Sequence, residues 1–129
     1  MKDREKFTDR WQHTVRFYEG EMAEPRYDLS PQLDLVKRIV VSEYADTLYP
    51  FTSHWALCIS TAADVVGREN VPMICIEYRG NSSFRVEYWS RPGRSHDLQR
   101  EECEASRVWP ILESLFLRLK IEAEAAHAT

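Results

Sequence analysis

The chain has 129 residues, of which 43% are hydrophobic and 29% charged, and its formal net charge is -4. This length suits one domain and this composition suits a folded globular protein, which excludes intrinsic disorder and a fibrous architecture. The acidic balance also argues against a domain that binds nucleic acid chiefly by neutralising phosphates, so nucleic acid is not an expected partner.

The charged N-terminal segment lacks the apolar run of a signal peptide, and no stretch approaches the roughly 18 apolar residues of a membrane span. The three cysteines, Cys58, Cys75 and Cys103, are odd in number and have no Cys-x-x-Cys spacing. Such cysteines are expected to be reduced thiols. We therefore expect a cytoplasmic protein that does not contact a membrane.

Two amphipathic helices are predicted in the first part of the chain. Apolar residues recur every three or four positions from Asp3 to Met22, which places them on one side of a helix, and Pro25 prevents its continuation. Ser30 and Pro31 suit the N-cap and the first position of a second helix. The apolar stripe of this helix has to end by Tyr49, because a proline follows.

The apolar pattern then changes to a two-residue repeat, which is typical of strands. Residues 55–60 follow this repeat and predict a strand, whereas residues 61–67 fit a short helix and a plain loop about equally. Two further strands are predicted from Met73 to Arg79 and from Phe84 to Trp89. Turn-forming residues separate them, so they are expected to form a hairpin.

The register of this hairpin follows from keeping its large apolar side chains on one face. Pairing of this kind places Met73 opposite Trp89 and Glu77 opposite Arg85. We take Arg79 opposite Ser83, around a three-residue loop, as an example of a turn that keeps this parity. A slip of one residue would expose six large side chains, so the apolar face and not the ion pair is expected to fix the register.

The last part of the chain predicts a third long helix. Residues 96–106 are too polar and acidic to assign, but from Val108 to Ala123 the apolar residues return to helical spacing. The predicted order is therefore ααβββα. This order indicates a single α+β domain over residues 1–129, with a short antiparallel sheet and helices packed on one of its faces.

No catalytic residue, cofactor or metal ligand is predicted. Nucleophile motifs, glycine-rich phosphate loops and His-Glu-x-x-His are absent, and His96, Asp97 and Cys103 lack the short spacings of zinc ligands. Catalytic groups can still converge from distant positions in a sequence. An enzyme is therefore the less favoured class, but it is not excluded.

A candidate anion-binding loop contains Arg91, Arg94, His96 and Arg100, whose side chains suit phosphate or carboxylate groups. Three glutamates follow within the next few residues and would neutralise this charge. The alternative interpretation is a solvated loop, which is the usual fate of arginine-rich loops.

The face of the sheet opposite the core is expected to be partly apolar. In the predicted register it carries Met73, Cys75 and Trp89 at one end and charged side chains at the other. An apolar patch bounded by charges is typical of an interaction surface. This face predicts a module that binds a protein partner, or itself as a homodimer. The alternative is that the first helix covers the patch through Phe17.

A second functional hypothesis is a small-molecule binder or enzyme with a pocket between the second helix and the sheet. Tyr44, Tyr49, His54 and Tyr78 would supply polar tips to this apolar cavity. Buried tyrosines more often satisfy their hydroxyl groups within a core, which is the competing interpretation.

Overall fold

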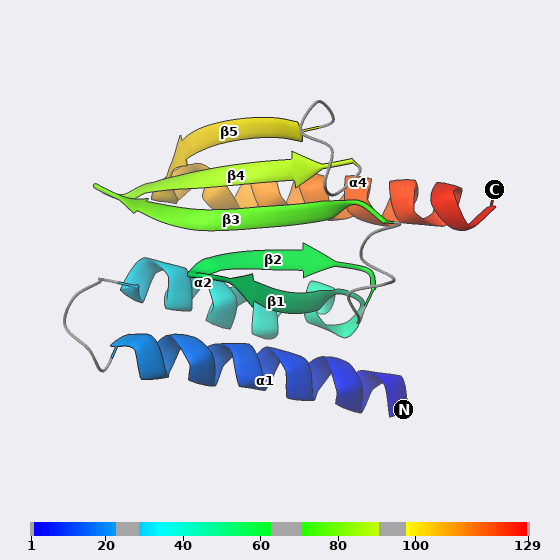
Figure 1. Cartoon of the computed structure of the whole chain (residues 1–129), viewed down its shortest axis with the longest axis horizontal. Helices are drawn as coiled ribbons and strands as arrows, with labels where there is room; N and C mark the ends of the chain where they lie inside the picture. The colour runs from blue at the N-terminus through cyan, green and yellow to red at the C-terminus, as the bar shows by residue number, and fades with distance from the viewer. Residues whose placement is uncertain (1, 23–28, 63–70, 91–97, 129) are drawn as a thin grey trace.

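The computed structural model describes residues 2–22, 29–62, 71–90 and 98–128, and in this part of the chain three long helices accompany a five-stranded antiparallel sheet. Helices α1 (Lys2–Met22) and α2 (Ser30–Val40) precede the sheet, and α4 (Val108–Ala128) follows it (Figure 1). The strands lie in the order β1-β2-β3-β4-β5, so neighbours along the chain are also neighbours in the sheet. The predicted α+β class is confirmed.

The strands are β1 (Tyr49–Ser53), β2 (Ala56–Ser60), β3 (Met73–Gly80), β4 (Ser83–Trp89) and β5 (Leu98–Glu104), with short 3-10 helices η1 (Glu43–Asp46) and η3 (Ala105–Arg107). The sequence pattern identified the three central strands and missed the two at the edges. β1 contains Pro50, which is tolerated at a sheet edge because an edge strand can lack a hydrogen-bond donor. β5 is mostly exposed, so it shows no apolar alternation.

The predicted second helix is shorter than its apolar spacing indicated. α2 ends at Val40, and the chain continues as η1 instead of running to Tyr49 as one helix. Ser42 marks the break: its hydroxyl donates to the carbonyl oxygen of Ile39 at 2.6 Å and accepts from the N–H of Tyr44 at 3.2 Å. Such side-chain hydrogen bonds compete with the backbone hydrogen bonds of a helix. The presence of a serine in the sequence was not enough to predict the break.

The hairpin of β3 and β4 has the predicted apolar register. Met73 lies opposite Trp89, and Glu77 lies opposite Arg85. The apolar positions of both strands therefore share one face, as the parity argument required. Of the segment left open at 61–67, residues 63–67 lie outside the described residues.

The turn of this hairpin is tighter than the three-residue loop taken as an example, and that part of the prediction is wrong. Gly80, and not Arg79, lies opposite Ser83, because the pairing shifts by one residue before the turn. Asn81 and Ser82 have φ angles of 51° and 58°, the left-handed values of a two-residue turn that matches strand twist. The bulge at Arg79 takes up the extra residue.

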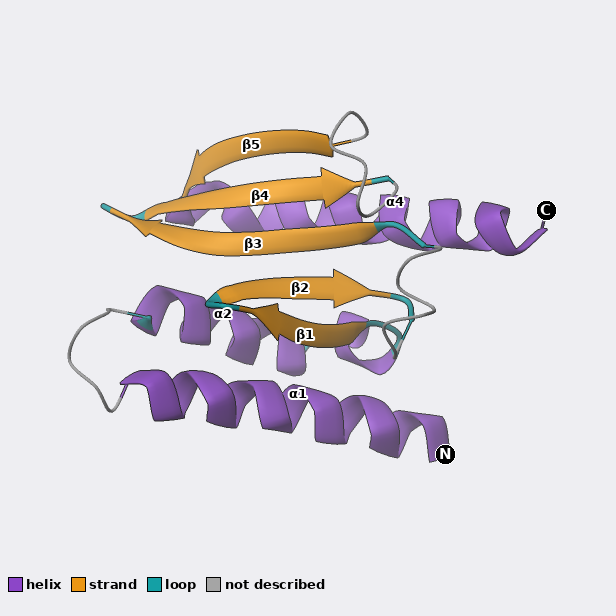
Figure 2. Cartoon of the chain, viewed as in Figure 1, coloured by secondary structure: helices purple, strands orange, loops and turns teal. Residues whose placement is uncertain are grey.

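One face of the sheet forms the core with α2 and α4 (Figure 2). Fully or almost fully buried strand residues on this face are Leu57, Ile59, Ile74, Ile76, Phe84, Val86 and Tyr88. From α4, Leu112, Phe116 and Leu119 are each 0% exposed. The apolar stripe predicted for the last helix therefore packs on the core.

Hydrogen bonds join helix α1 to backbone groups just before and just after the edge strand β1. The indole Nε1 of Trp11 donates to the carbonyl oxygen of Leu48 at 2.9 Å, just before β1 begins. The hydroxyl of Tyr18 donates to the carbonyl oxygen of Trp55 at 2.9 Å, in the turn after β1. These two bonds hold the helix beside β1, where it covers a free sheet edge.

The side-chain amide of Gln32 forms hydrogen bonds with β3 at the point where the pairing of β3 with β2 ends, at Leu57 and Ile76. Gln32 of α2 is 0% exposed. Its Nε2 donates to the carbonyl oxygen of Ile76 at 2.8 Å, and its Oε1 accepts from the N–H of Tyr78 at 3.0 Å. The amide thus satisfies the backbone groups that a longer β2 would have satisfied.

Replacement of Gln32 by leucine should therefore lower the free energy of unfolding by about 2 to 4 kcal/mol, because two backbone groups would lose their partners in the core. Denaturant unfolding measures this change. Gln12→Leu, at an exposed position of α1, is the matched control and should change stability by less than about 0.5 kcal/mol. Equal stabilities for the two variants would contradict the role of the buried amide.

Candidate functional site

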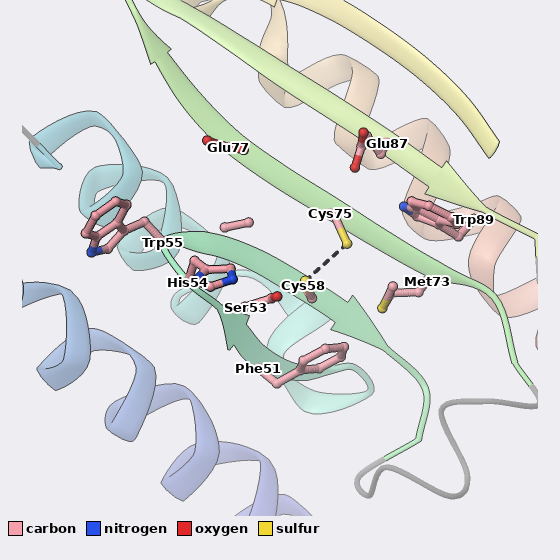
Figure 3. Close-up of a pocket in the computed structure, with 11 residues that line it drawn as sticks. Phe51, Ser53, His54, Trp55, Cys58, Met73, Cys75, Glu77, Glu87 and Trp89 are labelled. Atoms are coloured by element: carbon pink, nitrogen blue, oxygen red, sulfur yellow. Dashed lines mark hydrogen bonds between the residues drawn. The ribbon is translucent and has the colours of Figure 1, made fainter. Parts of the chain in front are cut away.

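The face of the sheet opposite the core is hollowed (Figure 3). The hollow has a volume of about 590 Å3 and extends over β1 to β4 and the turn between β1 and β2. We call it the sheet-face hollow. Its lining residues are Phe51, Ser53, His54, Trp55, Ala56, Cys58, Met73, Cys75, Glu77, Glu87 and Trp89.

Strand geometry determines which side chains form the apolar part of the hollow. Successive side chains of a strand point to opposite faces, so Cys58 faces the hollow while Leu57 and Ile59 on either side of it enter the core. The pairing of β3 with β4 then sets Met73 beside Trp89. The three residues predicted for the interaction patch, Met73, Cys75 and Trp89, thus lie together in one concave surface.

Helix α1 does not line the sheet-face hollow in the described part of the chain. Its contacts with Leu48 and Trp55 hold it at the edge of the sheet. Phe17, which was considered as a cover for the patch, instead meets the ring of Tyr18 edge to face at 5.2 Å and packs against the core. The described residues of α2 and α4 do not line the hollow either, since both helices occupy the core face.

Charged side chains at the other end of this face are paired with one another. Arg100 of β5 contacts Glu87 at 2.7 Å, and Arg85 contacts Glu102 at 3.4 Å. A third pair joins Arg79 to Glu77 at 3.1 Å. Exposed pairs of this kind add little stability, but among the described residues they balance three arginines against three glutamates.

Two tryptophans border the apolar part of the hollow. Trp55 is 36% exposed, and its indole Nε1 donates to a carboxylate oxygen of Glu21 at 3.2 Å. The Nε1 atom of Trp89 is buried and has no hydrogen-bond partner among the described residues. The hollow is therefore bounded by large rings of the kind that are enriched in interfaces and ligand sites.

A pair of cysteines forms part of the hollow's surface. Cys58 and Cys75 are directly opposite each other on β2 and β3, and their Sγ atoms are 3.1 Å apart (Figure 3). The hydrogen bond with the Cys58 thiol, burial, and the negative charge of Glu87 raise the pKa of Cys75. This thiol therefore stays protonated at neutral pH.

The sequence predicted three reduced thiols, and it did not predict direct contact between Cys58 and Cys75. The sequence did contain a signal for this contact, because Cys58 and Cys75 each lie at an outward-facing position of a predicted strand. The pairing of those two strands with each other was not predicted. Cys103, the third cysteine, lies opposite Phe84 on β5 and packs against the core instead.

The structure does not bring the four residues of the alternative pocket to one cavity. The ring of Tyr44 lies 4.7 Å from Phe116, that of Tyr49 lies 4.1 Å from Phe7, and that of Tyr78 lies 5.3 Å from Phe84. His54 is in the turn between β1 and β2 and lines the sheet-face hollow. Between α2 and the sheet, the core residues Val36, Ile39, Ile59 and Ile74 are each 0% exposed.

Most of the candidate anion-binding loop lies outside the described residues, which include neither Arg91, Arg94 nor His96. Arg100 is described, and its guanidinium is already paired with Glu87. Within the described ranges, no cluster of three or more His, Cys, Asp or Glu residues could hold a metal ion. In the same ranges, none of the helices combines the length and apolarity needed to cross a bilayer.

Comparisons of this chain with protein-family models, with curated proteins and with solved structures gave no match. A function is therefore inferred from the geometry of the sheet-face hollow. Its chemistry is that of an apolar surface with two thiols, two indole rings and a charged border.

Proposed function

We propose that this protein is an interaction module that forms a homodimer through the second face of its sheet. The observation that carries the proposal is the sheet-face hollow itself, which no described helix residue lines. Met73, Trp55 and Trp89 contribute large apolar side chains to it, and contiguous apolar patches bordered by polar residues mark interaction sites. The proposal keeps the cytoplasmic location expected from the sequence, a compartment in which free thiols are mostly held reduced.

A second copy of the chain is a suitable partner on electrostatic grounds. Two identical patches meet across a twofold axis, so any strong single charge on the patch would repel itself. Here the three arginine–glutamate pairs balance the charge of the face. The apolar part of the hollow would lie near the axis, and sheets packed face to face are separated by about 10 Å of interdigitated side chains.

Sedimentation velocity tests the proposal. We expect the mass of the wild-type protein to rise from 15.2 kDa towards twice that value as its concentration increases through the micromolar range. Met73→Glu should raise the protein concentration needed for this association at least tenfold, because it would place an unpaired charge in the apolar centre.

Val41→Glu provides the matched control for this substitution. Val41 is 85% exposed just after α2, so the same charge there should leave association unchanged. A wild-type mass that stays at 15.2 kDa into the high micromolar range would contradict the proposal. Equal effects of the two substitutions would also contradict it.

A second candidate function is the binding of a small apolar molecule in the same hollow. Its volume of about 590 Å3 falls in the usual range for ligand sites. The ring of Trp89, whose buried indole N–H has no acceptor in the described part of the chain, would form one wall of such a site. This candidate differs from the pocket predicted between the second helix and the sheet, because it uses the opposite face.

A further inference from the structure

The two cysteines of the hollow have the geometry from which a disulfide forms. Directly opposite residues of antiparallel strands have Cα atoms about 4.5 or 5.5 Å apart, within the range that disulfides span. Cys58 and Cys75 are such a pair, and their Sγ atoms are 3.1 Å apart. Bond formation would bring the sulfur atoms about 1 Å closer and would need no change in strand pairing.

The two cysteines differ in their exposure to the hollow. Cys58 is 2% exposed, whereas Cys75 is partly exposed, and both line the hollow. A reagent that enters the hollow therefore meets Cys75 first and finds Cys58 next to it. Cys103 is on β5 and packs against the core, so it cannot take part without rearrangement of the sheet.

We propose that Cys58 and Cys75 are a redox-active dithiol, oxidised to an intrachain disulfide by low-molecular-weight disulfides of the glutathione type. The Cys75 thiol loses its proton and attacks one sulfur of the small disulfide, which forms a mixed disulfide and releases one small thiol. Cys58 then loses its proton and attacks the Cys75 sulfur, which releases the second small thiol. The protein loses two hydrogens and two electrons, and the small disulfide gains them.

The raised pKa of Cys75 makes the first step slow at neutral pH, since the thiolate is the attacking species. The second step is favoured by proximity, because the resolving Sγ of Cys58 lies 3.1 Å from the Cys75 sulfur that it would attack. The pair should therefore pass from dithiol to disulfide with little accumulation of the mixed form. The inference does not depend on homodimer formation, because the reaction needs only one chain.

Incubation of the wild-type protein with excess oxidised glutathione in mildly alkaline solution tests the inference. Dilute protein should be used so that the hollow is open. Mass spectrometry should show the loss of two hydrogens, and peptide mapping after alkylation should place the bond between Cys58 and Cys75 with Cys103 still alkylated. Excess reduced glutathione should restore all three thiols.

Substitutions separate the pair from the third cysteine. Cys103→Ser should oxidise with the same midpoint as the wild type, within about twofold, because Cys103 is remote from the pair. Cys75→Ser and Cys58→Ser should lose the intrachain disulfide completely.

Three results in the wild-type protein would overturn the inference, and none depends on the folding of a variant. They are thiols that all remain free after prolonged incubation, a glutathione adduct that persists unresolved, and a disulfide to Cys103 or to a second chain. A protein that forms the intrachain bond but stays monomeric at high micromolar concentration would refute the proposed homodimer and support the dithiol.

Discussion

Replacement of Phe116 by alanine is expected to lower the free energy of unfolding by about 3 to 5 kcal/mol. The Phe116 side chain is 0% exposed in the middle of α4, and its ring centroid lies 4.7 Å from that of Tyr44 in η1. The substitution would remove apolar area from the core and leave a cavity between the last helix and the segment that precedes β1. Because the neighbouring core residues come from several elements, this cavity cannot close through one side-chain movement.

The control for this prediction is the next residue of the same helix. Leu117 is 61% exposed, so Leu117→Ala removes a similar number of atoms from the surface and should cost less than about 0.5 kcal/mol. Urea unfolding of both variants, followed by circular dichroism, measures the difference. Similar losses at the two positions would mean that α4 does not present the face described above to the core.

The sequence predicted those parts of the fold whose apolar pattern is strong and regular. Alternation in β3 and β4 was enough to pair Met73 with Trp89, because any other parity would expose a row of large side chains. Helical spacing of the apolar residues placed Phe116 in the stripe of the last helix, and this residue is buried. Leu115, in the same stripe, is only partly buried, because it lies at the border of the packed face.

Features that depend on a partner element could not be predicted from one segment alone. Gln32 looks like an ordinary polar residue of a helix, and its burial is explained only by the backbone groups of β3 that it satisfies. The edge strand β5 lacks apolar alternation because most of it faces solvent. It is recognisable as a strand only from its pairing with β4.

The candidate site could be predicted only in part, because it too depends on how separate elements pack together. The patch of Met73, Cys75 and Trp89 followed from the hairpin register, and the structure places all three in the hollow. Whether the first helix covered that patch could not be decided from its sequence. The decision depends on the bonds of Trp11 and Tyr18, which join the helix to backbone carbonyl groups near β1.

Trp89→Ala is expected to raise the dissociation constant of the proposed homodimer about 30-fold or more. Tryptophans at the centre of an interface commonly contribute about 2 kcal/mol or more, and each 1.4 kcal/mol is a factor of ten in affinity. Trp89 lies on the central hairpin and lines the hollow, so in a symmetric dimer its loss would count twice. The effect on folding should be smaller, because Trp89 is on the face opposite the core.

Trp109→Ala is the matched control for this substitution. Trp109 is partly buried near the start of α4, where the guanidinium of Arg38 lies 4.3 Å from its ring. It does not line the sheet-face hollow. Its replacement should affect stability without changing the dissociation constant by more than about twofold, provided that the variant is folded.

Sedimentation equilibrium of the wild type, Trp89→Ala and Trp109→Ala is the decisive test of homodimer formation through the sheet-face hollow. We expect a wild-type homodimer, a dissociation constant about 30-fold or more higher for Trp89→Ala, and a near wild-type value for Trp109→Ala. A wild-type protein that remains monomeric at high micromolar concentration, or a dimer that Trp89→Ala leaves intact, would contradict it.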